Sequence, residues 1–107
     1  MHRALAVAAS SLLLMPPQAS PDADAFFARG VKLHQAGDLV GAIEAYQLAL
    51  EKDPERVDPR SNLGAAYAQL GRHDEAIANY RAVLATVPDQ AQVRLNLALA
   101  LYKSNRI

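Results

Sequence analysis

A period of 34 residues runs through the chain after Ser20, and it constrains the fold more than any other feature. Seven pairs of residues 34 positions apart are identical, namely Gly30/Gly64, Gly37/Gly71, Ala42/Ala76, Ile43/Ile77, Tyr46/Tyr80, Leu50/Leu84 and Pro54/Pro88. The same register continues from Asn62-Leu63 to Asn96-Leu97, which begins a third, incomplete unit. A fixed period of this length predicts supersecondary units that stack on one another to make a continuous core.

Each unit is expected to form two helices. Apolar residues recur at helical spacing up to Gly37, where glycine can end one helix and Asp38 can cap the next. In the second unit we expect Asp58 to be the N-cap, with Pro59 at the first helical position. The chain is therefore predicted to be all-α, with helices over residues 23–36, 39–52, 58–70, 73–86 and 91–103.

These units resemble the tetratricopeptide repeat (TPR), whose pattern is W-x2-L-G-x2-Y, then A-x3-F, then P. The matching residues of the second unit are Leu63-Gly64, Tyr67, Ala76, Tyr80 and Pro88, and those of the first are Gly30, Ala42, Tyr46 and Pro54. The first unit departs in having Phe26, Arg29 and Leu33 in the tryptophan, leucine and tyrosine slots, and the third offers Leu97, Ala98 and Leu101. The resemblance implies an α-solenoid of stacked antiparallel helix pairs, a TPR-like superhelix, with repeats at about 23–56, 57–90 and, incomplete, 91–107.

Small and large residues alternate at the positions where the two helices of a unit should cross. The small ones, Gly30, Gly64, Ala42 and Ala76, allow the helix axes to approach closely. The large ones, Tyr46, Tyr67 and Tyr80, are expected to fill the volume beside them.

The predicted helix 91–103 is apolar nearly all round, and Leu95, Leu97, Leu99 and Leu101 have nothing after them to cover them. Repeat arrays need about three units and a polar terminal cap. We favour the explanation that the chain is the N-terminal part of a longer array. The alternative is that this helix is covered by another molecule, including a second copy of the chain.

The first twenty residues have the pattern of a secretory signal. Met1-His2-Arg3 gives a positive start, residues 4–15 carry no charge, and Pro16 to Ser20 end the run. The run is far shorter than the roughly 20 residues that span a bilayer, so contact with the membrane would be transient. We expect a signal peptide over 1–20, a helical repeat domain over 21–107, and a periplasmic or extracellular product. A misassigned start codon or a merely apolar N-terminal helix is the alternative.

Charge and composition exclude several classes of function. Eleven basic residues balance 11 acidic ones, so the chain lacks the positive field of a nucleic-acid-binding protein. The absence of cysteine excludes disulfides, thiolate zinc sites and a cysteine nucleophile. The residues that could serve catalysis are His34, His73, Ser61 and Ser104, and nothing in the sequence brings them together. We interpret His73 as a partly buried packing residue and expect no enzyme, cofactor or metal.

The resemblance also implies where a ligand would bind, because in this family the first helix of every unit lines the concave face. Lys103, at the end of the predicted helix 91–103, has a slot on this concave face. The residues predicted to form a peptide-binding groove are Phe27, Val31, Ser61, Asn62, Ala65, Gln69, Gln92, Leu95, Asn96 and Leu99.

Asn62 and Asn96 occupy one slot in successive units, which resembles the asparagine ladder that some family members use to bind a peptide backbone. The alternative is that these amides form hydrogen bonds within the array, and Ala28 breaks the ladder in the first unit. Other members bind a C-terminal carboxylate with lysine and arginine. The cationic groups are missing here, which disfavours binding of Hsp70-type or Hsp90-type tails.

Together these features predict an exported module for protein–protein interaction that binds a peptide or partner protein in its concave groove. Two alternatives stay open. The repeats could serve only self-association through helix 91–103, giving a homo-oligomer, or they could be the recognition module of an enzyme encoded beyond Ile107.

Overall fold

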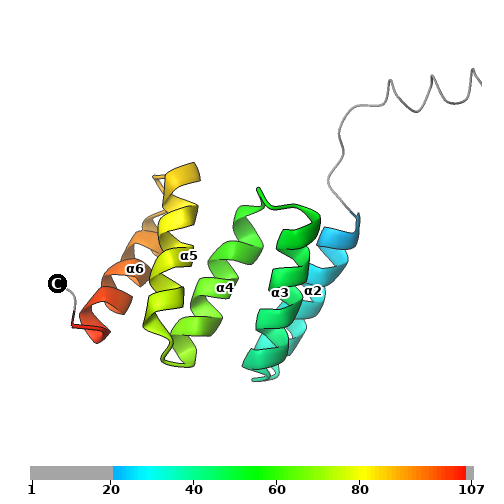
Figure 1. The fold of residues 1–107 in the computed structure, drawn as a ribbon, viewed down its shortest axis with the longest axis horizontal. Helices are drawn as coiled ribbons and strands as arrows, with labels where there is room; N and C mark the ends of the chain where they lie inside the picture. Colours follow the sequence, from blue (N-terminus) through cyan, green and yellow to red (C-terminus); the bar gives the residue numbers. More distant parts are fainter. Residues whose placement is uncertain (1–20, 106–107) are drawn as a thin grey trace, which may run out of the picture.

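The structure, a computed structural model, describes residues 21–105 as five helices joined by short turns (Figure 1). They are α2 (Pro21–Gln35), α3 (Leu39–Lys52), α4 (Val57–Gln69), α5 (His73–Thr86) and α6 (Ala91–Lys103). The all-α prediction is confirmed for this part of the chain, and each helix begins and ends within two residues of its predicted bounds. The predicted signal peptide lies outside the described residues. Within residues 21–105, no helix combines the length and hydrophobicity needed to cross a membrane.

The turn between α2 and α3 follows the predicted chemistry. Gly37 has φ +85°, the left-handed conformation that ends a helix at low cost only when the residue is glycine. The next residue, Asp38, caps α3, because its Oδ1 accepts a hydrogen bond of 2.9 Å from the backbone N–H of Gly41. Gly71, with φ +76°, repeats the same turn one unit later.

The predicted start of α4 is wrong. Arg56, not Asp58, is the N-cap residue, and Pro59 stands at the third helical position. The helix begins earlier because Val57 packs against the core, while the Arg56 guanidinium pairs with Asp24 on α2 and lies 3.6 Å from Asp58 Oδ2. Asp58 is thus inside the first turn, where a carboxylate interacts favourably with the helix dipole, and Pro59 removes an N–H that has no helical partner.

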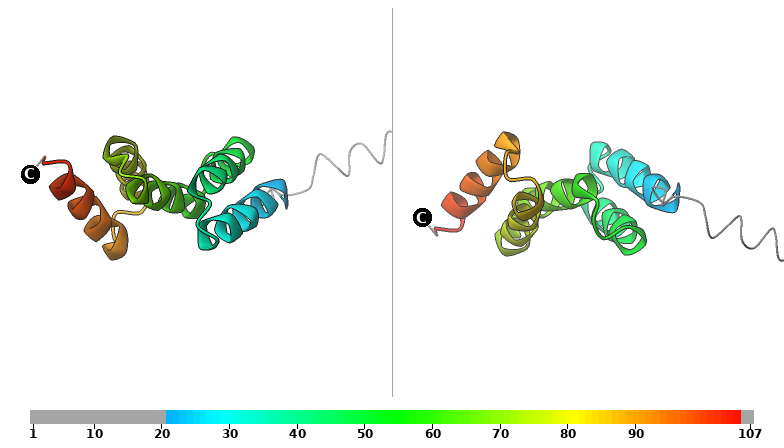
Figure 2. Two further views of the ribbon diagram at one scale, coloured as in Figure 1. Left: turned by 90° about the horizontal axis from the view of Figure 1, so that it is seen from below. Right: turned by 90° about the horizontal axis from the view of Figure 1, so that it is seen from above.

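The helices form a single curved row. Each packs against its neighbours in sequence, and α4 also contacts α2 and α6, whereas α3 and α5 do not contact each other. The first helices of the units are therefore closer together than the second helices, so the side that bears α2, α4 and α6 is the concave one. We call it the inner face. Figure 2 shows α2 and α6 on one side of the row, α3 and α5 on the other, and α4 between them.

The core lies between the helices of each unit, where the predicted pairing of small and large residues is confirmed. Tyr46 and Tyr80 are almost completely buried, and so are Ala42 and Ala76. The remaining buried apolar side chains of this cluster come from α3 to α6 and are Ile43, Leu63, Ala66, Tyr67, Ile77, Val83, Val93 and Ala100.

The expectation that all four leucines of the last helix are uncovered is wrong for two of them. Leu97 and Leu101 are half-buried against the core, because α6 packs along α5. Leu95 and Leu99 lie on the inner face and are 53% and 47% exposed. The helix therefore has a packed side and an open side, with Tyr102, 65% exposed, at its C-terminal end.

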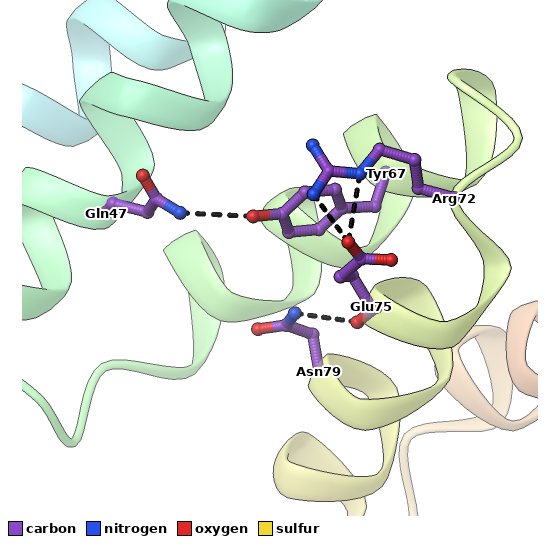
Figure 3. A network of polar contacts seen from close by, with 5 residues as sticks. All are labelled: Gln47, Tyr67, Arg72, Glu75 and Asn79. Carbon is purple, nitrogen blue, oxygen red and sulfur yellow. Dashed lines mark hydrogen bonds and ion pairs between the residues drawn. The ribbon is translucent and has the colours of Figure 1, made fainter.

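A network of polar contacts joins the two units on the side of α3 and α5 (Figure 3). The Gln47 side chain donates a hydrogen bond of 3.1 Å to the Tyr67 hydroxyl, and the Arg72 guanidinium lies 4.8 Å from the centre of the Tyr67 ring. Arg72 also donates from Nε and Nη2 to Glu75 Oε2, at 2.9 and 2.5 Å. These hydrogen bonds hold the pKa of the Glu75 carboxyl below its ordinary value.

Candidate functional site

The predicted groove residues lie on α2, α4 and α6, the three helices of the inner face, and they differ in how much of each a ligand could reach. Phe27 and Val31 are half-buried against the core, and Phe27 is further covered by the Arg56 guanidinium, 5.5 Å from its ring centre. The exposed members of the set are Gln69, Gln92, Leu95 and Leu99, whereas Ser61, Asn62, Ala65 and Asn96 are half-buried. The α4–α6 half of the inner face is thus more open than the α2 half.

In the first unit the buried Tyr46 hydroxyl is held by a network that links the two units. Gln69 Oε1 can only accept, so His34 donates to it from Nε2 at 2.8 Å. The other ring nitrogen, Nδ1, then accepts from the Tyr46 hydroxyl at 2.9 Å. Asn62 donates a longer bond of 3.5 Å to the same hydroxyl. Burial raises the pKa of Tyr46, and the hydrogen bond from Asn62 partly offsets this.

In the second unit the corresponding Tyr80 hydroxyl makes no hydrogen bond within the described residues. The slot of His34 is taken by Ala68, 34 positions on, which has no polar side chain and far less volume. Asn96 has the slot of Asn62, but it accepts a hydrogen bond of 3.1 Å from Gln92. Burial raises the pKa of Tyr80 with no hydrogen bond to offset it.

The missing imidazole leaves a concavity of about 240 Å³ between α4 and α6, with side chains of α5 completing it. We call it the polar hollow. Its polar lining comes from Gln69, His73, Tyr80, Asn96 and Lys103, and the small residues are Ala65, Ala68 and Ala100. Four of the predicted groove residues, Ala65, Gln69, Asn96 and Leu99, line it together. The hollow is thus part of the inner face.

His73, one of the residues that line the polar hollow, has an unusual ring nitrogen. The residue is half-buried, as predicted, but its Nδ1 is buried without a hydrogen-bond partner in the described part of the chain. The first unit has Leu39 in this slot. A buried polar nitrogen without a partner costs stability, and a ligand group that bonds to it would remove that cost.

The two ladder asparagines are each engaged inside the array, but neither is saturated. Asn62 uses one N–H for the Tyr46 hydroxyl, which leaves its Oδ1 as an acceptor. Asn96 uses its Oδ1 to accept from Gln92, which leaves its two N–H donors. Each asparagine can therefore keep its hydrogen bond within the array and still form one with a peptide.

Comparison with known proteins decides the family. The TPR repeat family matches the chain twice, over residues 30–71 and 66–105. The chain belongs to the tetratricopeptide repeat family. Among solved structures, the TPR array of this chain is similar to that of the MamA protein, with a TM-score of 0.77 and 25% identity over 79% of this chain and 46% of that one.

Curated relatives carry the same TPR sequence in longer proteins. The small glutamine-rich tetratricopeptide repeat-containing protein 2 of Mycosarcoma maydis is 37% identical over 79 residues, which are 74% of this chain and 22% of that protein. The photosystem I assembly protein Ycf3 of Synechococcus sp. strain CC9605 is 31% identical over 98 residues, 88% of this chain and 57% of that one. The chain therefore spans about a fifth of the length of the first of these relatives and just over half of the length of the second. Members of the TPR family are generally protein–protein interaction modules without enzyme activity of their own, and the two TPR matches in this chain support a module of that kind.

Sequence reasoning did not identify the polar hollow. It treated His73 and Tyr80 only as packing residues and gave Ala68 no role. The signal was present in the 34-residue comparison, because the second unit departs from the first at the slots of His34 and Leu39. Two departures that bring a smaller residue and a polar one to the same side of a buried tyrosine indicate an open, polar site.

Proposed function

We propose that this TPR module binds an extended segment of a partner protein along its inner face. The observation that supports the proposal is the pattern of helix contacts, in which α4 touches both α2 and α6 while α3 and α5 stay apart. This curvature makes the face that carries the predicted groove residues concave, as a surface that wraps a peptide must be.

The side chains of the inner face suit recognition of the peptide backbone more than recognition of charge. Asn62 retains an acceptor and Asn96 retains two donors, so together they can bond to a peptide C=O and N–H. Leu95 and Leu99, both substantially exposed, can pack against apolar side chains of the same segment.

The test is to select peptides by phage display against the full chain and to measure the binding of one of them. Replacing Asn62 and Asn96 together by Ala should weaken binding by about 1–3 kcal/mol, since each loss leaves a peptide group unpaired. The control is Asn79→Ala, because Asn79 lies on α5 and donates to the Glu75 carbonyl. If the double variant binds the peptide normally but melts earlier, the two asparagines are structural and do not bind ligand.

We also propose that the protein is exported, on the strength of the pattern in residues 1–20 alone. Fusing the chain to alkaline phosphatase, which becomes active only outside the bacterial cytoplasm, should give an active reporter. Leu13→Arg should abolish that activity, because a charge interrupts the apolar run. Equal activity of the unchanged and the substituted fusions would contradict export by this segment.

Self-association through α6 is the second candidate function. The observation that favours it is the exposure of Leu95, Leu99 and Tyr102 along one helix. An apolar surface of this kind attracts a partner, and a second copy of the chain would be one. Because Leu95 and Leu99 belong to both candidate surfaces, a selected peptide that occupies the groove should dissociate any dimer.

A further inference from the structure

The polar hollow lacks the hydrogen-bond acceptor that stands at the corresponding place beside Tyr46 in the first unit. There, the Tyr46 hydroxyl donates to His34 Nδ1, an acceptor placed 2.9 Å away by the side chain of residue 34. In the second unit Ala68 provides no acceptor, and the Tyr80 hydroxyl is without a hydrogen bond in the described chain. A ligand that enters the hollow would stand where the imidazole of His34 stands, and it should present an acceptor to Tyr80.

Two more residues of the lining, His73 and Lys103, define the charge of that acceptor. His73 Nδ1, buried and without a partner in the described residues, can donate when this nitrogen carries the proton. Lys103 is the only residue of the lining with a fixed charge, and its ammonium can only donate. Three groups able to donate, one of them cationic, together favour an anionic acceptor over a neutral one.

We propose that the polar hollow binds the carboxylate of an aspartate or glutamate side chain within the segment bound on the inner face. The proposal rests on the inner face being the peptide-binding surface. A side chain, and not the end of a peptide, is the source of the carboxylate because Asn96 lies in the same lining. Its two N–H donors, which make no hydrogen bond within the described residues, are free to hold the backbone of the segment next to the hollow, so we expect the segment to continue past this point.

The test uses a small probe that does not depend on any selected peptide. The full chain, labelled with ¹⁵N, is titrated with N-acetyl-glutamate N-methylamide and followed by NMR. Saturable shifts should be concentrated at the amides of Gln69, His73, Tyr80 and Lys103. The neutral glutamine analogue should leave those signals in place, and N-acetylglycine, which carries only a terminal carboxylate, should shift them less. Equal shifts with the glutamine analogue, stronger shifts with N-acetylglycine, or no shifts at these residues would overturn the proposal.

Three variants test the residues, and two of them copy the first unit so that folding is retained. Ala68→His fills the hollow with the residue of the first unit and should abolish binding of the probe. His73→Leu restores the residue at position 39 and should weaken binding about tenfold. Lys103→Gln should weaken it about two- to fivefold because this ammonium is exposed. Lys32→Gln, on α2, is the control. If Ala68→His and His73→Leu keep their helicity by circular dichroism and bind the probe as the unchanged chain does, the proposal is overturned. This holds whether or not Lys103→Gln folds.

The selected peptides separate this proposal from the proposed function. If both hold, the peptides should share an acidic residue at one position, and replacing it by Asn or Gln should weaken binding about tenfold. Peptides that bind the inner face without any acidic residue contradict the hollow proposal and leave the function standing. Saturable binding of the glutamate probe to a chain that selects no peptide supports the hollow and contradicts the function.

Discussion

The ring of Tyr46 lies directly against the backbone of Gly30. A Cβ atom built at Gly30 would stand 2.5 Å from Tyr46 Cδ1 and Cε1, closer than real carbon atoms approach. Gly64 and Tyr80 repeat the relationship one unit later, with 2.6 Å to Tyr80 Cε1. The tyrosine is almost fully buried in both units, so its ring has little room to retreat. The absence of a side chain at position 30 or 64 is what allows each helix pair to close.

Replacing Gly30 or Gly64 by Ala should therefore destabilise the fold by about 1–3 kcal/mol, although alanine favours helices more than glycine does. Urea denaturation followed by far-UV circular dichroism measures the change. Ala98 has the same slot in the third unit but is exposed, so Ala98→Ser is the control and should change stability by less than about 0.5 kcal/mol. A stabilised Gly30→Ala variant would show that the two helices separate at little cost.

Removing the hydroxyl from each of the two buried tyrosines should have unequal effects at neutral pH. Tyr46→Phe removes a hydrogen bond and leaves His34 Nδ1 without its donor, so it should cost about 0.5–1.5 kcal/mol. Tyr80→Phe removes a hydroxyl that has no partner in the described residues and should stay within about 0.5 kcal/mol. The two melting temperatures, measured side by side, check the difference. Equal losses would mean that Tyr80 has a partner in solution.

Stability should fall in alkaline solution. Burial raises the pKa of both Tyr46 and Tyr80 above the ordinary value of 10.0. The unfolded chain then loses these protons at a lower pH than the folded chain. The stabilisation is complete below pH 10 and is lost as the pH rises from 10 through the folded-state pKa values. A double Tyr46→Phe, Tyr80→Phe variant should lose less stability between pH 9 and pH 11, whereas Tyr102→Phe, at an exposed position, should keep the original profile.

The cap of α3 should contribute measurably to stability. Asp38→Ala removes the bond to the Gly41 amide and should cost about 0.5–2 kcal/mol. Asp89→Ala changes the same type of side chain in the turn before α6, where the structure gives it no hydrogen bond or ion pair, and serves as the control. Chemical denaturation of both variants gives the comparison, and an equal effect would mean that charge, not capping, is responsible.

Association of the chain should depend on two leucines of α6 and not on the other two. Replacing Leu95 and Leu99 by Ser should shift the sedimentation velocity profile towards the monomer, because these side chains are exposed. The matched pair Leu97→Ser and Leu101→Ser changes residues packed against the core, so it should lower the melting temperature instead. A chain that is monomeric at high concentration before any substitution would exclude α6 as an interface.

Local sequence rules were sufficient for most of the helical framework. Gly37 and Asp38 predict their turn because left-handed φ and side-chain capping are properties of adjacent residues. Gly30 and Tyr46 were assigned to one crossing because a small and a large residue occupy slots on the two helices of the same unit. The start of α4 could not be read in this way. Asp58-Pro59 has the pattern of a cap, but the contacts that set the boundary join Arg56 to Asp24, 32 residues earlier.

Only part of the candidate site could be predicted, because it too depends on contacts between residues far apart in the sequence. The helices that carry the groove follow from the period, whereas the polar hollow depends on three helices meeting at Tyr80. Its volume results from Ala68, its unpaired nitrogen from His73 and its charge from Lys103. Each of these residues is ordinary for its own helix, so no local motif marks them. Only the comparison of the two units shows the changes at the slots of His34 and Leu39, and only the juxtaposition of the three residues gives the site its chemistry.

The restriction of contacts to nearby helices determines how the array should come apart. Among the five described helices, α6 touches only α5 and α4, and nothing joins it to α2 or α3. Such an array can open from one end while the rest stays folded, so the amide hydrogens of α6 should exchange with solvent sooner than those of α3 or α4. A group bound between α4 and α6 would hold α6 against α4 and make this opening less frequent. Ligand occupancy would then be readable as slower exchange in α6, with almost no change in α2.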